Sequence, residues 1–230
     1  AREADSPLRM GAGLAAGWYG CGNTSLANPS TIKAGVRADG RIVLHQGAED
    51  IGQGADTVIP QIFAHALGVE VAALEVLGGD TDITPDCGKT SASRQTFVTG
   101  NAARLAGEAL RAQILRHANA GEDARIVATP GGLRVEDEAG TRDVPLAALE
   151  ADGEGYVLRA EETYDPPTRP LDENGQGAPY AQYGYAAQLA VVEVDTALGT
   201  VKARRFVAAH DVGRAVNPLL VEGQVEGGIA

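Results

Sequence analysis

Two loops carry the residues best suited to binding chemistry. The first is Glu49-Asp50-Ile51-Gly52-Gln53-Gly54, which comes just before apolar residues at helical spacing. Free backbone N–H groups and the helix dipole attract anions at a helix N-terminus, so a phosphate could bind there. The spacing matches neither the Walker loop nor the dinucleotide pattern, and Asp56 at the cap position would compete for the same donors. An ordinary capped turn is therefore the alternative interpretation.

The second loop lies just before another helical pattern and combines hydroxyls, cations and an amide. Hydroxyl groups and helix N-terminal amides can share phosphate oxygens, and a guanidinium adds a planar fork of donors. A solvated helix cap is the competing interpretation. Two such loops, each leading into a helix, favour one extended phosphate-bearing ligand. The candidate binding residues here are Thr90, Ser91, Ala92, Ser93, Arg94 and Gln95.

Other site chemistries have little support in the sequence. His210 and Asp211 are adjacent, the serines are distant and no nucleophile elbow is present, which argues against a hydrolase triad. The four histidines do not recur at metal-ligand spacing, and the two cysteines form no Cys-x-x-Cys motif. We therefore predict no zinc or iron–sulfur site. Cys21 and Cys87 are interpreted as reduced thiols, with a bridge between them left open.

The elements that must position these loops mix strands and helices. Apolar runs on both sides of Ala38-Asp39-Gly40 predict a hairpin, and Gly11 to Gly17 is interpreted as a flexible strand entry. Pro60 is compatible with a helix that begins at about Asp56. The pattern predicts an α+β fold, with helices packed on mixed, mostly antiparallel sheets. The expected elements are a hairpin in 31–46, helices over about 56–68 and 95–118, strands at 69–77, 124–128, 133–136 and 156–160, a short helix at 146–149, a hairpin over 183–209 and a helix starting after 216.

A segment rich in proline and glycine over 165–180 divides the chain. We predict a first α+β cofactor-binding subdomain over 1–164, a linker over 165–180, and a hairpin with the start of a helix over 181–230 that belongs to a second, truncated subdomain. The last helix has no closing cap, so we expect a piece of a longer protein.

Composition excludes several classes of function. The net charge of −12 disfavours nucleic acid and anionic membrane as partners, while a hydrophobic content of 44% supports a buried core. No apolar stretch reaches the roughly 20 residues of a spanning helix, and Ala1 to Asp5 lack a signal-peptide profile. We expect a soluble, cytoplasmic protein.

Taken in order, the motifs resemble the large, molybdopterin-binding subunit of the aldehyde oxidase and xanthine dehydrogenase enzymes. Each motif alone is weak, but their order and spacing from about Gly11 to the end of the chain are specific. The motifs are Asp50-Ile51-Gly52-Gln53-Gly54, Gly79-Asp80-Thr81-Asp82-Ile83-Thr84-Pro85, Thr90-Ser91-Ala92-Ser93-Arg94, Thr99-Gly100-Asn101-Ala102, His210-Asp211-Val212-Gly213-Arg214-Ala215-Val216-Asn217-Pro218 and Gly223-Gln224-Val225-Glu226-Gly227.

The resemblance implies roles for the loops. Gly52, Gln53 and Gly54 would approach the pterin or its dinucleotide phosphates. Residues 90–95 would wrap the cofactor, with the Ala92 main chain close to molybdenum, and Gln224 would be a further contact. In this family the pterin dithiolene holds the metal, so no side-chain metal ligand is expected.

The resemblance also implies an activity, namely hydroxylation of an aldehyde, purine or other N-heterocycle with water-derived oxygen. The family's glutamate base lies beyond Ala230, so no catalytic residue is expected in this chain, and Glu226 is assigned a structural role. The implied cofactor is molybdopterin with molybdenum, in the cytosine dinucleotide form. Iron–sulfur and FAD centres would lie on partner subunits or domains, and the remainder of the subunit or a companion chain would complete the site. This piece alone would be inactive. The alternative is a non-catalytic, truncated cofactor-binding or assembly domain.

Overall fold

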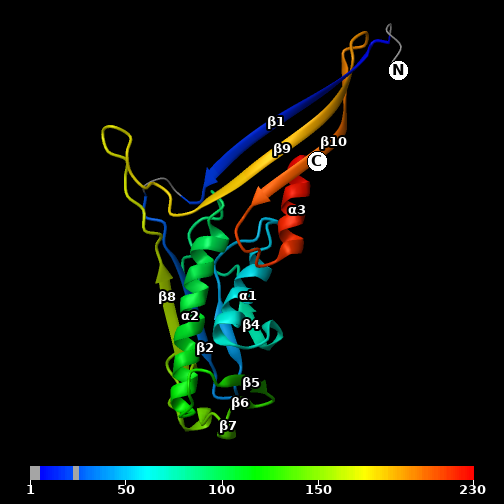
Figure 1. The fold of residues 1–230 in the computed structure, drawn as a ribbon. Helices are drawn as coiled ribbons and strands as arrows, with labels where there is room; N and C mark the ends of the chain where they lie inside the picture. The colour runs from blue at the N-terminus through cyan, green and yellow to red at the C-terminus, as the bar shows by residue number, and fades with distance from the viewer. Residues whose placement is uncertain (1–5, 23–25) are drawn as a thin grey trace. The chain divides into compact units, whose positions relative to one another are not determined.

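A computed structural model describes residues 6–22 and 26–230 and divides the chain into two compact units (Figure 1). The larger unit is Cys21–Ala181, and the smaller unit combines Ala1–Gly20 with Gln182–Ala230. We predicted one subdomain over 1–164, but the strand Leu8–Gly20 belongs to the smaller unit, because it pairs with a strand that begins at Tyr183. Ala1 to Asp5, for which the sequence predicts no signal peptide, lie outside the described residues.

The larger unit is built on a four-stranded mixed sheet in the order β4-β3-β2-β8. β2 (Ser30–Val36) pairs antiparallel with β3 (Ile42–His45) and with β8 (Leu158–Tyr164), whereas β3 pairs parallel with β4 (Leu74–Leu77). Helices α1 (Ala55–Leu67) and α2 (Gln95–His117) pack together on one face of this sheet (Figure 1). This arrangement confirms the predicted α+β fold, the first hairpin and both long helices.

The core lies between that sheet face and the two helices. Ile32, Ala34 and Val36 alternate along β2 and are fully buried, as the period of two in a strand requires. They meet Phe63 of α1 and Leu110 of α2 in one apolar cluster. The same alternation turns Lys33 and Arg37 toward the opposite face of the sheet, where they form a second cluster with His45 and Tyr156.

Helix α1 connects β3 to the parallel strand β4. It begins after Gly54, at φ +88°, and ends at Gly68, at φ +85°, both in the left-handed region that glycine adopts without strain. Pro60 lies inside α1, beyond the first turn, so the carbonyl of Asp56 loses the N–H it would otherwise bond. The strand expected over 69–77 starts late, because a 3₁₀ turn, η1 (Val71–Ala73), comes before β4.

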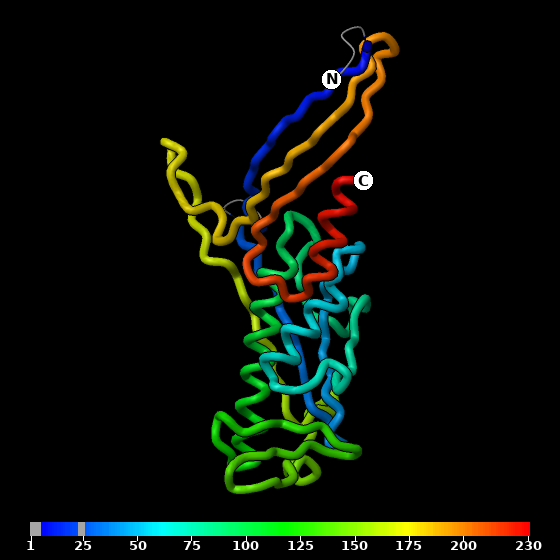
Figure 2. The backbone as a smooth tube through the Cα atoms, turned by 45° about the vertical axis from the view of Figure 1, so that its right-hand side comes forward, coloured from blue at the N-terminus to red at the C-terminus, as the bar shows by residue number. Residues whose placement is uncertain are grey.

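A small meander of three strands lies next to the far end of α2 (Figure 2). Its order is β5 (Arg125–Thr129), β6 (Gly132–Asp137) and β7 (Gly140–Asp143), followed by the short helix η2 (Leu146–Ala148). The sequence predicted β5, β6 and η2 but not β7, which lacks apolar alternation. The segment 165–180 belongs to the larger unit and contains a bridge between Arg169 and Ala178.

The smaller unit contains long antiparallel strands in the order β1-β9-β10. β9 (Tyr183–Asp195) and β10 (Thr200–Asp211) form the predicted hairpin. Helix α3 (Pro218–Ile229) is capped by Asn217, whose side chain accepts a hydrogen bond from the Leu220 N–H at 3.3 Å. Gly11 to Gly17 lie inside β1 (Leu8–Gly20) and are not a flexible entry, because thirteen residues of this strand pair with β9. None of the described helices is long and apolar enough to cross a membrane.

Gly107 lets α1 and α2 approach closely. A Cβ at this position would lie 2.8 Å from the Ala66 Cβ and 2.9 Å from the Phe63 carbonyl oxygen. We expect Gly107→Ala to lower the free energy of unfolding by about 1 to 2 kcal/mol, because overpacking outweighs the gain in helix propensity. Urea denaturation measures this, with Gly121→Ala as the control, since no atom lies within 4 Å of a Cβ there. Equal stability of the two variants would contradict close helix packing at Gly107.

Candidate functional site

The two predicted loops meet at one edge of the larger unit. The first follows the carboxyl end of β3 and leads into α1, and the second follows the carboxyl end of β4 and leads into α2. The Thr90 Oγ1 donates a hydrogen bond to the Glu49 carbonyl oxygen at 2.9 Å, and the Gly47 N–H donates to the Cys87 Sγ at 3.2 Å. Ligands commonly bind beyond the carboxyl ends of parallel strands, so this edge is the candidate site.

The backbone N–H groups of the first loop already bind a carboxylate from the same loop. The Asp50 carboxylate accepts hydrogen bonds from the N–H groups of Gly52, Gly54 and Asp56 at 2.8, 3.1 and 3.1 Å. Partial burial opposes ionisation of Asp50, but these backbone donors outweigh it and lower the pKa of the carboxyl. The group that competes for the loop's donors is thus Asp50 and not Asp56, and the N-terminus of α1 is unfavourable for a phosphate.

Gln53 is held within the same loop. Its Oε1 accepts from the Ile51 N–H at 2.7 Å, and its Nε2 donates to the Glu49 carbonyl at 3.0 Å. The side chain therefore shapes the turn. The contacts of Gly52, Gln53 and Gly54 with a cofactor stay a prediction.

Arg94 has a structural role that sequence reasoning missed. Its side chain is 1% exposed and donates to the carbonyls of Asn28 at 2.9 Å, Pro29 at 2.7 Å, Lys89 at 3.3 Å and Cys87. Burial lowers the pKa of this guanidinium, but an arginine stays charged in proteins. Converging backbone carbonyls take the donors of both terminal nitrogens, so the Arg94 fork does not face a ligand as predicted, and a contact of Arg94 with the cofactor stays a prediction.

The remainder of the second loop presents backbone and hydroxyl groups outward. Ala92 and Ser93 have φ of 54° and 53°, a left-handed conformation that costs free energy in residues other than glycine. Ser91 and Ser93 are exposed, and α2 begins without a side-chain cap. Gln95 is buried and donates to the Thr90 Oγ1 at 3.0 Å, which supports the loop from beneath. The first-turn N–H groups of α2 are thus the groups at this loop that can donate hydrogen bonds to an anion.

Gln224 lies outside the two loops. It is in α3 of the smaller unit, and its contact with a cofactor stays a prediction. Neither Cys21 nor Cys87 forms a disulfide, and the buried Cys87 donates to the Thr31 carbonyl at 3.1 Å. Burial raises the pKa of the Cys87 thiol, so it packs as a neutral group. In the described ranges no three His, Cys, Asp or Glu side chains gather to hold a metal ion.

A polar cleft of about 390 Å³ opens beside the first loop, and sequence reasoning did not find it. Gln46 and Glu49 line it from the segment between β3 and α1, Asp56 lines it from α1, and Gly78 and Gly79 line it from the segment after β4. The available signal was a polar residue, Gln46, directly after the apolar strand β3, but the pairing of β3 with β4 was needed to interpret it.

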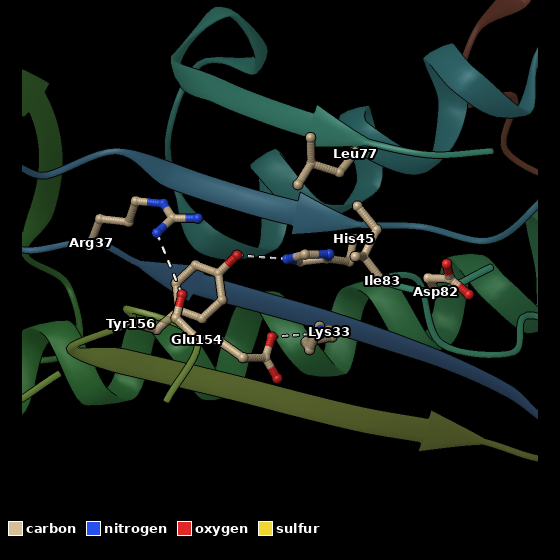
Figure 3. A pocket seen from close by; sticks show the side chains of 8 residues that line it. All are labelled: Lys33, Arg37, His45, Leu77, Asp82, Ile83, Glu154 and Tyr156. Carbon is tan, nitrogen blue, oxygen red and sulfur yellow. Dashed lines mark hydrogen bonds and ion pairs between the residues drawn. The ribbon is translucent and has the colours of Figure 1, made fainter. Parts of the chain in front are cut away.

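A second cleft, of about 450 Å³, lies on the sheet face that the helices leave open (Figure 3). The His45 Nε2 and the Tyr156 hydroxyl are 2.6 Å apart, and the Lys33 Nζ pairs with the Glu154 carboxylate at 2.7 Å. The Arg37 guanidinium lies 4.9 Å from the centre of the Tyr156 ring. These contacts fix the segment before β8 against the end of β3.

Comparison with known proteins identifies the family. The model of the molybdopterin cofactor-binding domain family matches residues 1–230, and the chain belongs to that family. The segment is thus a molybdopterin-binding domain of the molybdenum hydroxylase type.

Its relatives are larger proteins. The chain is 34% identical to the putative xanthine dehydrogenase molybdenum-binding subunit of Escherichia coli (strain K12), over 96% of this chain and 29% of that protein. It is 29% identical to the aldehyde oxidoreductase of Megalodesulfovibrio gigas, over 100% of this chain and 23% of that protein. The crystal structure of the aldehyde oxidoreductase from Desulfovibrio desulfuricans superposes with a TM-score of 0.77 at 29% identity, covering 99% of this chain and 23% of that one. The chain therefore spans less than a third of these relatives.

Replacement of Arg94 tests its structural role. We expect Arg94→Met to lower the free energy of unfolding by about 3 kcal/mol or more, because several buried carbonyls lose a charged donor. Arg104→Met is the matched control, since Arg104 forms an exposed pair with Glu108 and should change stability by less than about 0.5 kcal/mol. Chemical denaturation measures both. A fully stable Arg94→Met protein would show that the guanidinium is dispensable.

His45 makes stability depend on pH. Burial, then the nearby Lys33 charge, lowers its pKa, with Arg37 acting in the same direction and Glu154 and the Ile83 backbone opposing. Because the unfolded chain binds the His45 proton more readily, this contribution is complete above about pH 6.5 and is lost as the pH falls below that value. We expect the wild-type Tm to fall more than that of His45→Gln between pH 7.5 and 5.5. Parallel melting curves would rule out this role for His45.

Proposed function

We propose that this chain is part of the molybdenum subunit of an oxidoreductase that hydroxylates an aldehyde, a purine or another N-heterocycle with water-derived oxygen. The observation that carries the proposal is the meeting of the two family loops through the hydrogen bond between Thr90 and the Glu49 carbonyl. Family membership and the likeness to molybdenum-binding subunits support it.

The residues present fit an anionic cofactor at the second loop. The N-terminus of α2 has no side-chain cap, the Ser91 and Ser93 hydroxyls are exposed beside it, and Lys89 adds an exposed cation. The N-terminus of α1 differs, because the Asp50 carboxylate takes its donors. We therefore place the phosphate end of the cofactor at residues 89–95, held by hydroxyls and first-turn N–H groups.

When bound, molybdopterin with molybdenum supplies the redox step, and the protein orients cofactor and substrate. In this proposal the cofactor has the cytosine dinucleotide form, and the chain holds it without contributing the base. The catalytic glutamate would come from another part of the subunit, so this segment alone would be inactive. Iron–sulfur and FAD partners would accept the electrons, and the assembly would be cytoplasmic.

The smaller unit supports the need for further protein. Leu14 and Trp18 of β1 are 75% and 73% exposed, and Tyr185 of β9 and Phe206 of β10 are 54% and 44% exposed. The register puts Leu14, Trp18 and Tyr185 on one face and Phe206 on the other, so both faces of this sheet carry large apolar groups. We propose that the remainder of the subunit or a companion chain covers them.

Removal of the bond between the loops tests the proposal. We expect Thr90→Val to reduce bound molybdenum at least threefold, because the second loop loses its anchor on Glu49, while the secondary structure is retained. Thr129→Val is the control, since that hydroxyl bonds the Gly132 carbonyl away from the loops. Metal analysis and absorption spectra of protein purified with its associated chains provide the measurement. A wild-type protein without molybdenum would favour a non-catalytic cofactor-binding or assembly domain.

A further inference from the structure

A row of polar side chains runs through the core of the larger unit and ends at the second loop. Ser30 and Thr99 are fully buried, and Gln95 is 5% exposed. The Ser30 Oγ and the Thr99 Oγ1 are 2.7 Å apart, and Thr99 also bonds the Gln95 Oε1. The Gln95 Nε2 donates to the Thr90 Oγ1 at 3.0 Å, and the Thr90 Oγ1 is 2.9 Å from the Glu49 carbonyl oxygen of the first loop. These bonds form one continuous chain from the sheet to the site.

The protons of this chain can point in one direction only. A carbonyl cannot donate, so the single proton of the Thr90 hydroxyl goes to Glu49, and Thr90 accepts from Gln95. The Gln95 Nε2 also lies 3.4 Å from the Gly88 carbonyl oxygen, so the reversed amide would bring two oxygens together. The Gln95 Oε1 therefore faces Thr99 and takes the proton of its hydroxyl.

Ser30 is the first donor of the chain. Because Thr99 gives its one proton to Gln95, the Ser30 hydroxyl must donate in the bond between Ser30 and Thr99. The Ser30 hydroxyl also approaches the Cys87 sulfur, but sulfur is the weaker acceptor. Ser30 is the first residue of β2, and Thr99 lies on α2 four residues after Gln95. The chain therefore connects the sheet and α2 to both loops of the site.

We propose that Ser30 and Thr99 are positioning residues for the second loop and that they act through the Gln95 amide. Loss of the Thr99 hydroxyl leaves the Gln95 Oε1 buried without its donor, which costs free energy in that one orientation of the amide. Thr90 then loses the fixed donor that directs its own proton to Glu49, and the two loops are held less firmly. The effect on a bound cofactor rests on the proposed function, whereas the direction of the hydrogen bonds does not.

Two substitutions of Thr99 separate hydrogen bonding from packing. Valine keeps the shape and removes the hydroxyl, whereas serine keeps the hydroxyl and removes a methyl group. We expect Thr99→Val to reduce bound molybdenum roughly threefold or more, and Thr99→Ser to stay within about twofold of the wild type. A side chain that only fills space gives the reverse order, because serine leaves a cavity. Metal analysis of protein purified with its associated chains provides the measurement.

Thr163→Val is the matched control. The Thr163 hydroxyl bonds that of Thr31 at 2.8 Å, so it also joins a neighbouring element to β2, but the pair is exposed and lies outside the chain of bonds. Molybdenum content should not change in this variant. Ser30→Ala removes the first donor without altering either loop, should act in the same direction as Thr99→Val, and carries the test if Thr99→Val does not fold.

A readout that needs no cofactor is hydrogen exchange of the Gln95 side-chain amide, followed by NMR in the full 230-residue chain. Thr99→Val and Ser30→Ala should both accelerate this exchange, and Thr163→Val should not. Combination of Thr90→Val with Thr99→Val tests whether the residues act as one unit. Because both substitutions break the same chain, the double variant should lose little more molybdenum than the worse single variant, and much less than the product of the two losses.

The proposal is overturned if Thr99→Val retains molybdenum, if Thr99→Ser loses as much as Thr99→Val, or if the two losses multiply in the double variant. Unchanged exchange of the Gln95 amide in Thr99→Val and Ser30→Ala overturns it as well. A wild-type protein without molybdenum contradicts the proposed function instead, and the exchange of the Gln95 amide then decides alone whether Ser30 and Thr99 orient it.

Discussion

Arg94 is the residue on which the candidate site depends. Its buried guanidinium collects main-chain carbonyls from Asn28 and Pro29, ahead of β2, and from Cys87 and Lys89 in the loop before α2. Carbonyls can be buried only where they find donors, and one planar cation satisfies several at once. The loop that carries Ala92 and Ser93 in left-handed conformations is therefore held from below. Because the side chain performs this task, the loop presents its own N–H groups and hydroxyls outward.

The two helix N-termini at this edge have opposite character, although both follow glycine-containing loops. Asp50 closes α1 with a carboxylate that accepts three backbone N–H groups, whereas α2 starts without a side-chain cap. A helix end that already carries a negative charge cannot also favour a phosphate. Charge therefore divides the site. The side with Ser91 and Ser93 can bind an anion, whereas the side with Gln46 and Asp56 carries a carboxylate and repels one.

The sheets of the two units differ in what covers their faces. In the larger unit the open face is covered locally, because Gly35 gives the Tyr156 ring room to lie against β2; a Cβ there would lie 2.4 Å from that ring. In the smaller unit Leu14 and Trp18 are left exposed, with no comparable cover among the residues described there. Strands with apolar residues on both faces are typical of sheets buried between two layers. That sheet is consequently the surface on which we propose that further protein packs.

The sequence by itself determined the elements with strong local signals. Gly40 marked the first hairpin, Gly68 the end of α1, and the ordered motifs around Gly52, Thr90 and Gln224 marked the family, because turns, helix ends and motif spacing are written in neighbouring residues. Tertiary structure decided what depends on residues far apart in the chain. Pairing across about 180 residues joined Gly11 to Val192 and moved β1 into the smaller unit. Arg94, expected to bind phosphate, is instead a buried residue that supports the loop, and the Gln46 Oε1 is buried without a hydrogen-bond partner among the described residues. Burial and hydrogen-bond partners depend on contacts between distant residues, which no local sequence pattern records.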